Sequence, residues 1–367
     1  MSLSISFKHY SNWNAKLKDK PLIIAGPCSA ESEEQVLKTA KEIDKIKLVK
    51  IYRAGIWKPR TRPGSFDGIG TIALKWLQKV KEQTSLLTTV EVATPQHIED
   101  CLKHNVDILW IGARTTSNPF SVQELANALK GVKIPVMIKN PINPDLQLWS
   151  GAIERIANTG INTIAAIHRG FYPFEKTNFR NIPKWEVPIE LKTRFPNLPI
   201  ICDPSHISGK TKYVAEISQK AMDMNMDGLM IETHCCPEQA KSDIQQQLTP
   251  EQLQHLIENL NIRNSSSDNI GFINILEQYR DQIDSLDMQM LELLSQRMDI
   301  VEEIGEYKKE NNVTILQLRR WENILRTRIE HGSNLNLPQD FIKKLLQLVH
   351  KASIQKQTEV MYKGKKK

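Results

Sequence analysis

The sequence contains no apolar run long enough to span a bilayer, and its first residues lack the basic and then apolar pattern of a secretory signal. Its five cysteines are odd in number and irregularly spaced, which argues against a disulfide framework and for reduced thiols. These absences predict a cytoplasmic protein with no membrane partner. The content of 25% charged and 40% hydrophobic residues is typical of a globular protein with one large and one small domain, or with two to three average domains.

Acidic residues are too few to balance the basic ones, and the formal net charge is +7. Part of this excess lies in residues 363–367, which we interpret as a disordered basic tail. The other cations are spread along the chain, and many follow β-type runs instead of lining one helix face. This pattern favours small anionic substrates, phosphates and carboxylates, and we expect no nucleic acid.

Between about residues 21 and 260, short apolar runs alternate with longer amphipathic segments. The runs read PLIIAG, LVKIYRAG, LTTVEVAT, ILWIGAR, PVMIKN, TIAAIHRG, PIICDPSH and GLMIETH. Strands that are apolar on both faces and alternate with helices predict a parallel sheet, and roughly eight repeats over residues 1–262 predict a (β/α)8 TIM barrel. The alternative is a doubly wound open sheet, but no Gly-x-Gly-x-x-Gly turn follows the first run.

The composition changes after residue 262. Residues 263–271 form a polar linker rich in Ser and Asn, and residues 272–362 predict a small all-α domain of three helices. The first, over 273–309, has no proline and would be on the order of 55 Å long. A second is expected over 317–330, ending near Gly332, and a third from Pro338 to about Tyr362. Because a small monomer cannot bury so long a helix, we expect a homodimer through this domain and leave open whether dimers pair further.

Nearly every apolar run of the barrel ends in a charged residue or a potential metal ligand, where barrel enzymes place their active sites. Six cations would converge there and suit two phosphorylated anions: Arg53, Lys58, Arg60, Arg114, Lys139 and Arg169. Three of them lie in the loop 51–66, whose basic residues, taken alone, are as readily interpreted as a solvated charge run.

One thiol, one imidazole and two carboxylates form a candidate ligand set at the same rim. They are Cys28, His206, Glu232 and one further acid, for which we choose Asp243. Mixed soft and hard donors favour divalent manganese, iron, cobalt or zinc over magnesium. Alone, Cys28 is more often a buried core thiol, and His206 is as often a hydrogen-bonding loop residue. The turn DPSH at a strand end favours binding for His206.

These motifs together resemble the 3-deoxy-D-arabino-heptulosonate 7-phosphate (DAHP) synthases. The resemblance covers about residues 18–260 and rests on GPCS at Cys28, KPRT at 58–61, GARTT at Arg114, PVMIKN at Lys139, HRG at Arg169, DPSH at His206 and IETH at Glu232. The sister family that makes 3-deoxy-octulosonate 8-phosphate shares the barrel but typically has Asn where this chain has Pro59. The motif KPRT therefore favours erythrose 4-phosphate as the acceptor.

The resemblance implies condensation of phosphoenolpyruvate with erythrose 4-phosphate and release of phosphate. It assigns the metal to Cys28, His206, Glu232 and Asp243. The phosphate of phosphoenolpyruvate would be bound by Arg114, Lys139 and Arg169, and its carboxylate by Arg53 and Lys58. The phosphate of erythrose 4-phosphate would be bound by Arg60 and Thr61. The metal would polarise the aldehyde while the cations orient both anions. Lys58 is the candidate proton donor to the new alkoxide.

Residues 270–362 resemble the all-helical chorismate mutases. The matching positions are 280–284 (RDQID), Arg297, Lys308, Arg320, Ser353 and Gln357. Geometry supports the match, because Arg297 and Lys308 would share a helix face about 16 Å apart, within reach of one dicarboxylate. Arg280 would lie about 25 Å from Arg297 on the same helix and must serve the partner subunit's site.

This second resemblance implies rearrangement of chorismate to prephenate. Arg280, Arg297 and Arg320 would hold carboxylates, Lys308 and Gln357 would donate to the ether oxygen, and Ser353 would complete the site. The family usually has Glu where this chain has Trp321, and Asp near Gln317. The alternative is therefore a regulatory and dimerisation module that only senses chorismate or prephenate. Because the first strand begins by about Pro21, we expect ligand at this domain to inhibit the barrel.

Overall fold

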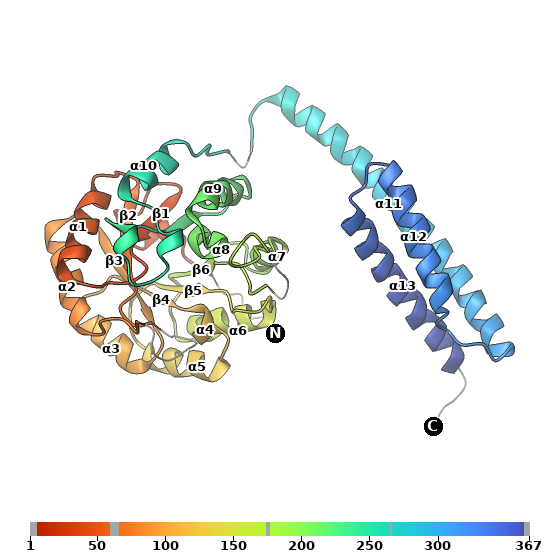
Figure 1. The fold of residues 1–367 in the computed structure, drawn as a ribbon, viewed down its shortest axis with the longest axis horizontal. Coiled ribbons are helices and arrows are strands. Elements are labelled where there is room, and N and C mark those ends of the chain that lie inside the picture. The colour runs from red at the N-terminus through yellow and green to blue at the C-terminus, as the bar shows by residue number, and fades with distance from the viewer. Residues whose placement is uncertain (1–5, 59–65, 174–176, 265, 363–367) are drawn as a thin grey trace. The chain divides into compact units, whose positions relative to one another are not determined.

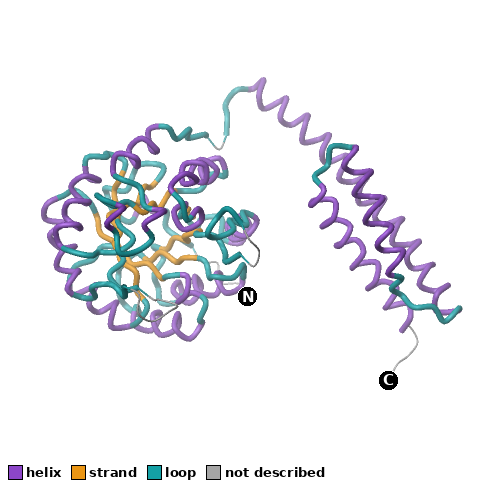
Figure 2. The backbone as a smooth tube through the Cα atoms, viewed as in Figure 1, coloured by secondary structure: helices purple, strands orange, loops and turns teal. Residues whose placement is uncertain are grey.

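The structure is a computed structural model that describes residues 6–58, 66–173, 177–264 and 266–362. It divides into two compact units, Met1–Ser265 and Ser266–Lys367, which we describe one at a time. In the first unit, helices surround a set of strands, whereas the described part of the second unit is built from helices (Figure 2). None of the described helices is long and apolar enough to cross a membrane.

Eight parallel strands form a closed barrel, which confirms the predicted TIM barrel (Figure 1). They are β1 (Leu22–Gly26), β2 (Val49–Ala54), β3 (Leu87–Val92), β4 (Ile108–Ile111), β5 (Val136–Lys139), β6 (Ile164–His168), β7 (Ile200–Cys202) and β8 (Gly228–Glu232). The first and last strands close the barrel, with Gly26 opposite Glu232. Because every strand runs the same way, all their carboxyl ends meet at one rim.

Helices cover the outside of the barrel. They are α1 (Glu33–Asp44), α2 (Ile72–Gln83), α3 (Pro95–Lys103), α4 (Ala113–Thr116), α5 (Pro119–Ala128), α6 (Leu146–Ala157), α7 (Glu186–Arg194), α8 (Pro204–Ser208), α9 (Val214–Asp223) and α10 (Pro250–Glu258). Short 3-10 turns lie at η1 (Tyr10–Asn12), η2 (Thr211–Tyr213), η3 (Pro237–Gln239) and η4 (Ile244–Gln246). Side-chain caps fix several helix starts: the side chain of Ser32 accepts from the backbone of Gln35 at α1, and Thr249 and Gln252 form a capping box at α10.

Two apolar layers stabilise the barrel. One lies between the strands and the helices, and the other fills the barrel itself, with Trp110 and Met137 among its members. Tyr10 and Leu17, which precede the first strand, belong to the inner layer. They pack with Leu22 at the start of β1, so they close the amino-terminal end of the barrel. The opposite rim is left to polar side chains.

The second unit contains α11 (Ile270–Glu310), α12 (Leu318–Asn334) and α13 (Gln339–Tyr362). The side chain of Asn269 caps α11 by accepting from the backbone of Phe272. The second helix, predicted over 317–330 with an end near Gly332, continues to Asn334. Gly332 lies inside α12, where a Cβ would come within 2.6 Å of Cδ1 of Ile342 on α13, so this glycine permits close packing instead of ending the helix.

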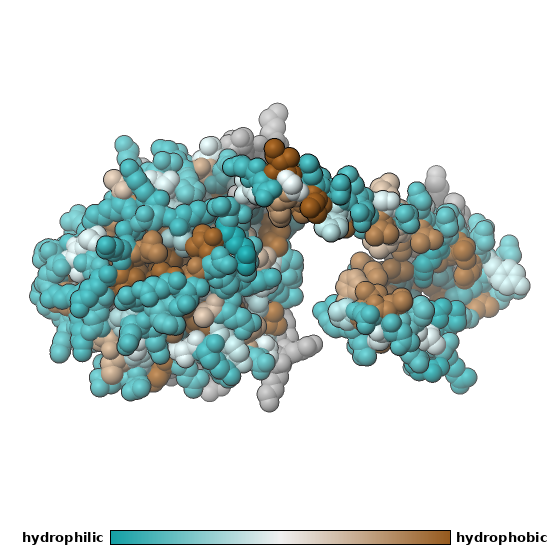
Figure 3. Space-filling model, turned by 90° about the horizontal axis from the view of Figure 1, so that it is seen from above, coloured by the Kyte–Doolittle hydropathy of each residue, from teal (hydrophilic) through white to brown (hydrophobic). Residues whose placement is uncertain are grey.

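The amino-terminal and middle turns of α11 expose apolar side chains that its own unit leaves uncovered. Ile283, Leu286, Met290 and Leu293 are between 49% and 65% exposed. Hydrophobic side chains also gather on the face of this unit seen in Figure 3. An exposed apolar stripe of this kind is typical of a surface that another chain covers.

Candidate active sites

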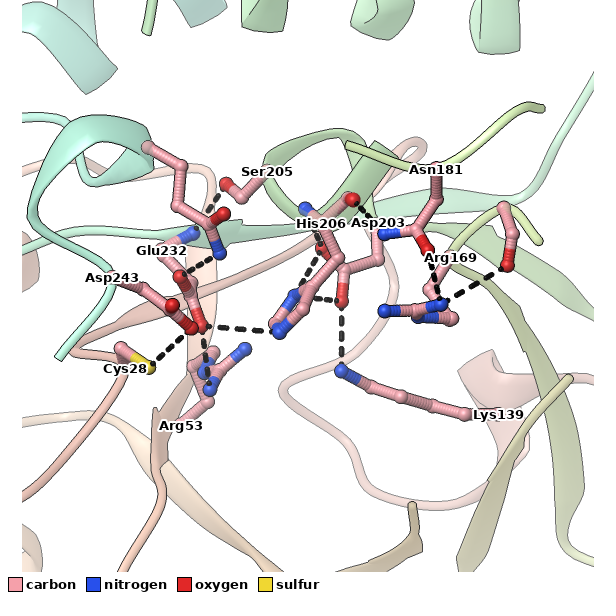
Figure 4. Close-up of polar contacts among 12 residues, drawn as sticks. Cys28, Arg53, Lys139, Arg169, Asn181, Asp203, Ser205, His206, Glu232 and Asp243 are labelled. Carbon is pink, nitrogen blue, oxygen red and sulfur yellow. Dashed lines mark hydrogen bonds and ion pairs between the residues drawn. The ribbon is translucent and has the colours of Figure 1, made fainter. Parts of the chain in front are cut away.

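The barrel brings the predicted metal ligands to the rim where its strands end (Figure 4). Cys28 follows β1, His206 lies in α8 directly after β7, and Glu232 ends β8. Asp243 comes from the segment after β8 and has a left-handed backbone, with φ of 50°. Each ligand therefore stands at a strand end or on the loop beyond it, as the sequence pattern predicted.

Three of these side chains form a tight group of potential donors. One ligand atom each from Cys28, Glu232 and Asp243 lies within 4.8 Å of the others. The Cys28 thiol donates to Oδ2 of Asp243 at 3.2 Å, and its backbone N–H donates to Oε1 of Gln247 at 2.9 Å. Burial raises the pKa of the Cys28 thiol to about 12. A bound cation would remove that proton, because thiolate is the ligating form.

His206 lies beside this group. Its Nε2 is 3.7 Å from Oε1 of Glu232, and its Nδ1 is 2.9 Å from Oδ2 of Asp203. With Nδ1–H donated to Asp203, the Nε2 lone pair is directed toward the donor group, which is how a carboxylate usually orients a ligating histidine. Asp203 is fully buried. Burial opposes its ionisation, but His206 and Lys139 hold the pKa of Asp203 well below its usual range.

The donor group fits a divalent ion. Oε1 of Glu232 is buried and accepts no hydrogen bond within the part of the chain that the structure describes. Cationic side chains approach each donor: Nζ of Lys58 donates to Sγ of Cys28 at 2.9 Å, and Nη2 of Arg53 lies 3.2 Å from Glu232. Nη1 of Arg180 lies 2.9 Å from Oδ1 of Asp243. The site thus attracts positive charge from three sides, and its S, N and O donors suit a first-row transition metal.

Among the predicted cations that the structure describes, Arg53 is the most buried, at 1% exposure. Its guanidinium lies 5.1 Å from the ring centre of Trp110. Two of its nitrogens, Nε and Nη1, are buried and donate to no described residue. Buried guanidinium N–H groups rarely lack a hydrogen-bond acceptor, so these two N–H groups indicate a binding position for an anionic ligand.

Lys139 and Arg169 extend the positive surface away from the metal donors. Nζ of Lys139 donates to Oδ2 of Asp203 at 2.8 Å, and Nη1 of Arg169 donates to Oδ1 of Asn181 at 2.7 Å. Burial lowers the pKa of Arg169 to about 10; Asp203 opposes this shift, and the nearby cations Arg180 and Arg114 add to it. Three guanidinium groups that repel one another within one site would be stabilised by a phosphate.

Several residues of this network were absent from the sequence-based prediction. They are Asn140, Arg180, Asn181, Asp203, Ser205, Gln246 and Gln247. Gln246 is typical of them: its amide donates to Oε2 of Glu232 at 2.6 Å and its carbonyl accepts from Arg180 at 2.7 Å. Asp203 could have been predicted, because it directly follows β7. Asn140 could have been predicted in the same way, because it directly follows β5, and Ser205 lies in α8 beside His206. Arg180, Asn181, Gln246 and Gln247 lie in segments whose path no sequence pattern specifies.

Lys58 reaches the metal donors, as described above, but two other predicted residues of its loop lie outside the described residues. These are Arg60 and Thr61, assigned to the phosphate of erythrose 4-phosphate. Arg114 lies on the one-turn helix α4, with its side chain exposed. The described part of the chain therefore brings together the metal ligands and the cations assigned to phosphoenolpyruvate.

The helical unit gathers a second cationic site on one face of α13. Nη1 of Arg297 donates to Oγ of Ser353 at 2.7 Å, so α11 and α13 supply two predicted residues to one place. Gly305 permits the close approach of these helices, since a Cβ there would lie 3.3 Å from Cα of Gln357. The side chain of Gln357 is buried, and its Oε1 accepts no hydrogen bond from a described residue.

Lys308 lies at the far end of this site. Its Nζ donates to the backbone carbonyl of Ile315 at 2.6 Å, and burial lowers the pKa of Lys308. A cavity of about 550 Å³ lies against Lys308 and Gln317. Arg320 is exposed on α12, whereas the exposed side chain of Arg280 pairs with Glu277 on α11. A single copy thus brings Arg297, Ser353 and the α11–α13 contact together, without Arg280.

A closed parallel barrel that collects metal donors and cations at one rim, followed by a separate helical unit with its own cationic site, defines a TIM-barrel enzyme with a second functional domain. The chain belongs to the DAHP synthetase I family, which matches residues 13–265. Residues 279–358 match chorismate mutase type II. Both resemblances are confirmed, and the chain is a bifunctional enzyme of the shikimate pathway with a DAHP synthase domain and a chorismate mutase domain.

Known relatives resemble the barrel. The phospho-2-dehydro-3-deoxyheptonate aldolase of Thermotoga maritima is 32% identical over 238 residues, which are 65% of this chain and 68% of that protein. A crystal structure of this DAHP synthase matches with a TM-score of 0.58 at 31% identity, over 64% of this chain and 67% of the other. The 2-dehydro-3-deoxyphosphooctonate aldolase of Dichelobacter nodosus is 27% identical, over 66% of this chain and 90% of that protein.

Proposed function

We propose that the barrel condenses phosphoenolpyruvate with erythrose 4-phosphate to give DAHP and inorganic phosphate, with one water consumed. The observation that carries this proposal is the pair of buried, unfilled N–H groups of Arg53 beside the donors Cys28, Glu232 and Asp243. An anion held by Arg53 would lie next to a metal-polarised electrophile. The motif KPRT at 58–61 supports erythrose 4-phosphate over a larger sugar phosphate.

Cys28, His206, Glu232 and Asp243 would hold a divalent manganese, iron, cobalt or zinc ion. When bound, this ion supplies Lewis-acid polarisation of the acceptor aldehyde. Asp203 orients His206, and Gln246 fixes the second oxygen of Glu232, so both ligands are positioned before an ion arrives.

Different cations would bind the two anionic groups of phosphoenolpyruvate. Arg114, Lys139 and Arg169 would bind its phosphate, and Arg53 with Lys58 its carboxylate. Lys58 would protonate an alkoxide formed beside the metal donors, and the 2.9 Å between its Nζ and Sγ of Cys28 supports this role. Arg60 and Thr61 would bind the phosphate of erythrose 4-phosphate, as the family motif implies.

The helical domain would rearrange chorismate to prephenate. This step is pericyclic and needs no nucleophile, so charge and shape are sufficient. Arg297 and Arg320 would hold carboxylates, Ser353 would support Arg297, and Lys308 and Gln357 would donate to the ether oxygen. The buried, unpaired Oε1 of Gln357 supports a ligand at this face, because an amide there can turn to present its N–H to the ether oxygen.

A homodimer would complete this site. Arg280 lies too far along α11 to reach Arg297 of its own chain, and the uncovered apolar side chains of α11 offer a surface for a second copy. We place the enzyme in the cytoplasm, which the five free cysteines support. Domain boundaries at residues 262 and 272 are part of this proposal.

A second function is favoured by Trp321, which stands where a glutamate is expected. The helical domain would then sense chorismate or prephenate and inhibit the barrel without turning either over. If saturating prephenate leaves the synthase rate unchanged, this regulatory role is wrong.

Two assays on one preparation test the proposal. Phosphoenolpyruvate consumption should require erythrose 4-phosphate and stop with a chelator, whereas chorismate loss should continue in the same chelator. Synthase activity that survives metal removal would contradict the metal assignment. Absence of chorismate loss would leave the helical domain as a sensor.

A further inference from the structure

The helical site contains one polar side chain that neither the sequence pattern nor the proposed mechanism uses. His350 lies on α13, three residues before Ser353 and seven before Gln357, so all three side chains share one helix face. Its ring stacks on Trp321 of α12, with centroids 3.9 Å apart and planes 10° apart. The residue that departs from the expected glutamate is therefore in contact with this histidine.

One ring nitrogen of His350 and the amide oxygen of Gln357 are both buried polar atoms without a hydrogen-bond partner among the described residues. The two atoms are Nε2 of His350 and Oε1 of Gln357. The Cα atoms of these two residues lie seven residues apart on the helix, about 10 Å, so both side chains can converge on neighbouring groups of one small ligand. Unpaired polar atoms at both ends of one helix face, with Ser353 and Arg297 between them, outline a single ligand.

Charge around His350 points to the same ligand position. Burial lowers the pKa of His350, and Arg297 and Lys308 lower it further, so both cations act on this ring. A neutral imidazole offers one donor and one acceptor, which matches a hydroxyl group. Arg297 bonds to Ser353, and Lys308 bonds to a backbone carbonyl, so neither cation holds a carboxylate of a described residue.

The chemistry of chorismate leaves one polar group without a partner. Its two carboxylates are assigned to arginines and its ether oxygen to Lys308 and Gln357, which leaves the ring hydroxyl. We propose that His350, held flat against Trp321, hydrogen-bonds the ring hydroxyl of chorismate through Nε2. Trp321 is then a positioning residue that fixes the plane of the imidazole, and its presence does not make the site incompetent. This inference rests on the proposed mutase function.

The test compares chorismate with an analogue that lacks the ring hydroxyl, using the full chain. His350→Leu should lower kcat/KM for chorismate about five- to tenfold, mainly through KM, because one hydrogen bond is lost. The same variant should change kcat/KM for the hydroxyl-free analogue less than about twofold. His350→Gln, which keeps a donor, should recover part of the loss, and Trp321→Leu should raise KM for chorismate but not for the analogue.

His331→Leu is the matched control, because it removes an exposed imidazole from α12 and should leave kcat/KM unchanged for both chorismate and the analogue. Synthase activity of each variant reports whether the barrel is intact, and helical circular dichroism reports on the second unit. Equal losses with both substrates would show that His350 only packs against Trp321 and would overturn the proposal.

Binding of a bicyclic ether dicarboxylate, a non-reactive mimic of the rearrangement's transition state, separates the two hypotheses. Calorimetry is done with this mimic made with and without the hydroxyl. If chorismate is never turned over but His350→Leu still abolishes discrimination between the two mimics, the mutase function fails and the role of His350 stands. If the wild-type chain binds both mimics equally, the role of His350 fails.

Discussion

The two sites hold their cations in opposite ways. At the barrel rim, Arg53 and Lys139 are at most 5% exposed, and each is paired with a buried carboxylate, Glu232 or Asp203. In the helical domain, Arg297 bonds to a hydroxyl and Lys308 to a backbone carbonyl, and neither pairs with a carboxylate of a described residue. The barrel neutralises these two cations before substrate arrives, whereas Arg297 and Lys308 keep their positive charge without a carboxylate partner among the described residues.

This difference follows from what each fold can bury. A closed barrel places eight strand ends around one rim, so one chain supplies both the cations and the carboxylates that hold them in place. Three helices bury few polar side chains, Ser353 and Gln357 among them, and in the proposed dimer part of their site would come from a second copy. We therefore expect the barrel site to tolerate loss of the helical dimer, and the helical site to depend on it.

The largest effect should come from the metal donors. Asp243→Asn should lower synthase kcat/KM about 1,000-fold, since loss of the ion removes about 4 kcal/mol of transition-state stabilisation. Chorismate loss should be unchanged, because the helical site uses no metal. Metal content and both rates are measured on one preparation. Glu99→Gln, on an exposed ion pair of the barrel unit, is the control. Full synthase activity in Asp243→Asn would contradict the ligand assignment.

The helical site is tested by mixing two inactive variants. Arg280→Met and Arg297→Met should each lower mutase kcat/KM about 100-fold, because each removes a charged hydrogen bond to a carboxylate. Coexpressed in equal amounts, they should recover about one quarter of wild-type activity, since half the dimers would be mixed and each would hold one intact site. No recovery would mean that Arg280 serves its own chain or no site at all.

Much of this arrangement could be predicted from the sequence, for a physical reason. Barrel strands are apolar on both faces and end at one rim, so Cys28, Lys139 and Glu232 could be placed together from their positions after eight apolar runs. The long helix α11 could also be predicted, because it has no proline and its apolar residues recur at helical spacing.

The residues that could not be predicted from the sequence lie on loops or in contacts between separate elements. Arg180 reaches Asp243 from a segment with no regular pattern, and Gln246 lies in a short 3-10 turn. The stacking of Trp321 on His350 joins two helices whose relative rotation no single-helix pattern specifies. From the sequence alone, Trp321 is therefore only the loss of a glutamate, whereas the structure shows its ring stacked on His350.

A third prediction compares Arg53, a buried cation of the barrel site, with an exposed cation of the same unit. Arg53→Met should raise KM for phosphoenolpyruvate so that kcat/KM falls about 30-fold, corresponding to about 2 kcal/mol for two charged hydrogen bonds. Lys103→Met removes a cation from an exposed ion pair with Glu99 and should change KM less than about twofold. An unchanged KM in Arg53→Met would mean that Arg53 only neutralises Glu232.

Salt should give the smallest effect and the most direct reading of the contrast between the sites. The screening length falls from about 10 Å at 0.1 M to about 3 Å at 1 M salt, and exposed charges are screened more than buried ones. Arg297 and Arg320 are exposed, so KM for chorismate should rise about three- to fivefold between 0.05 and 0.5 M potassium chloride, by an order-of-magnitude estimate. Arg53 and Lys139 are buried and paired, so KM for phosphoenolpyruvate should rise less than about twofold. Equal salt dependence at both sites would mean that the buried carboxylates of the barrel do not set its charge, and the distinction between a neutralised and a charged site would fail.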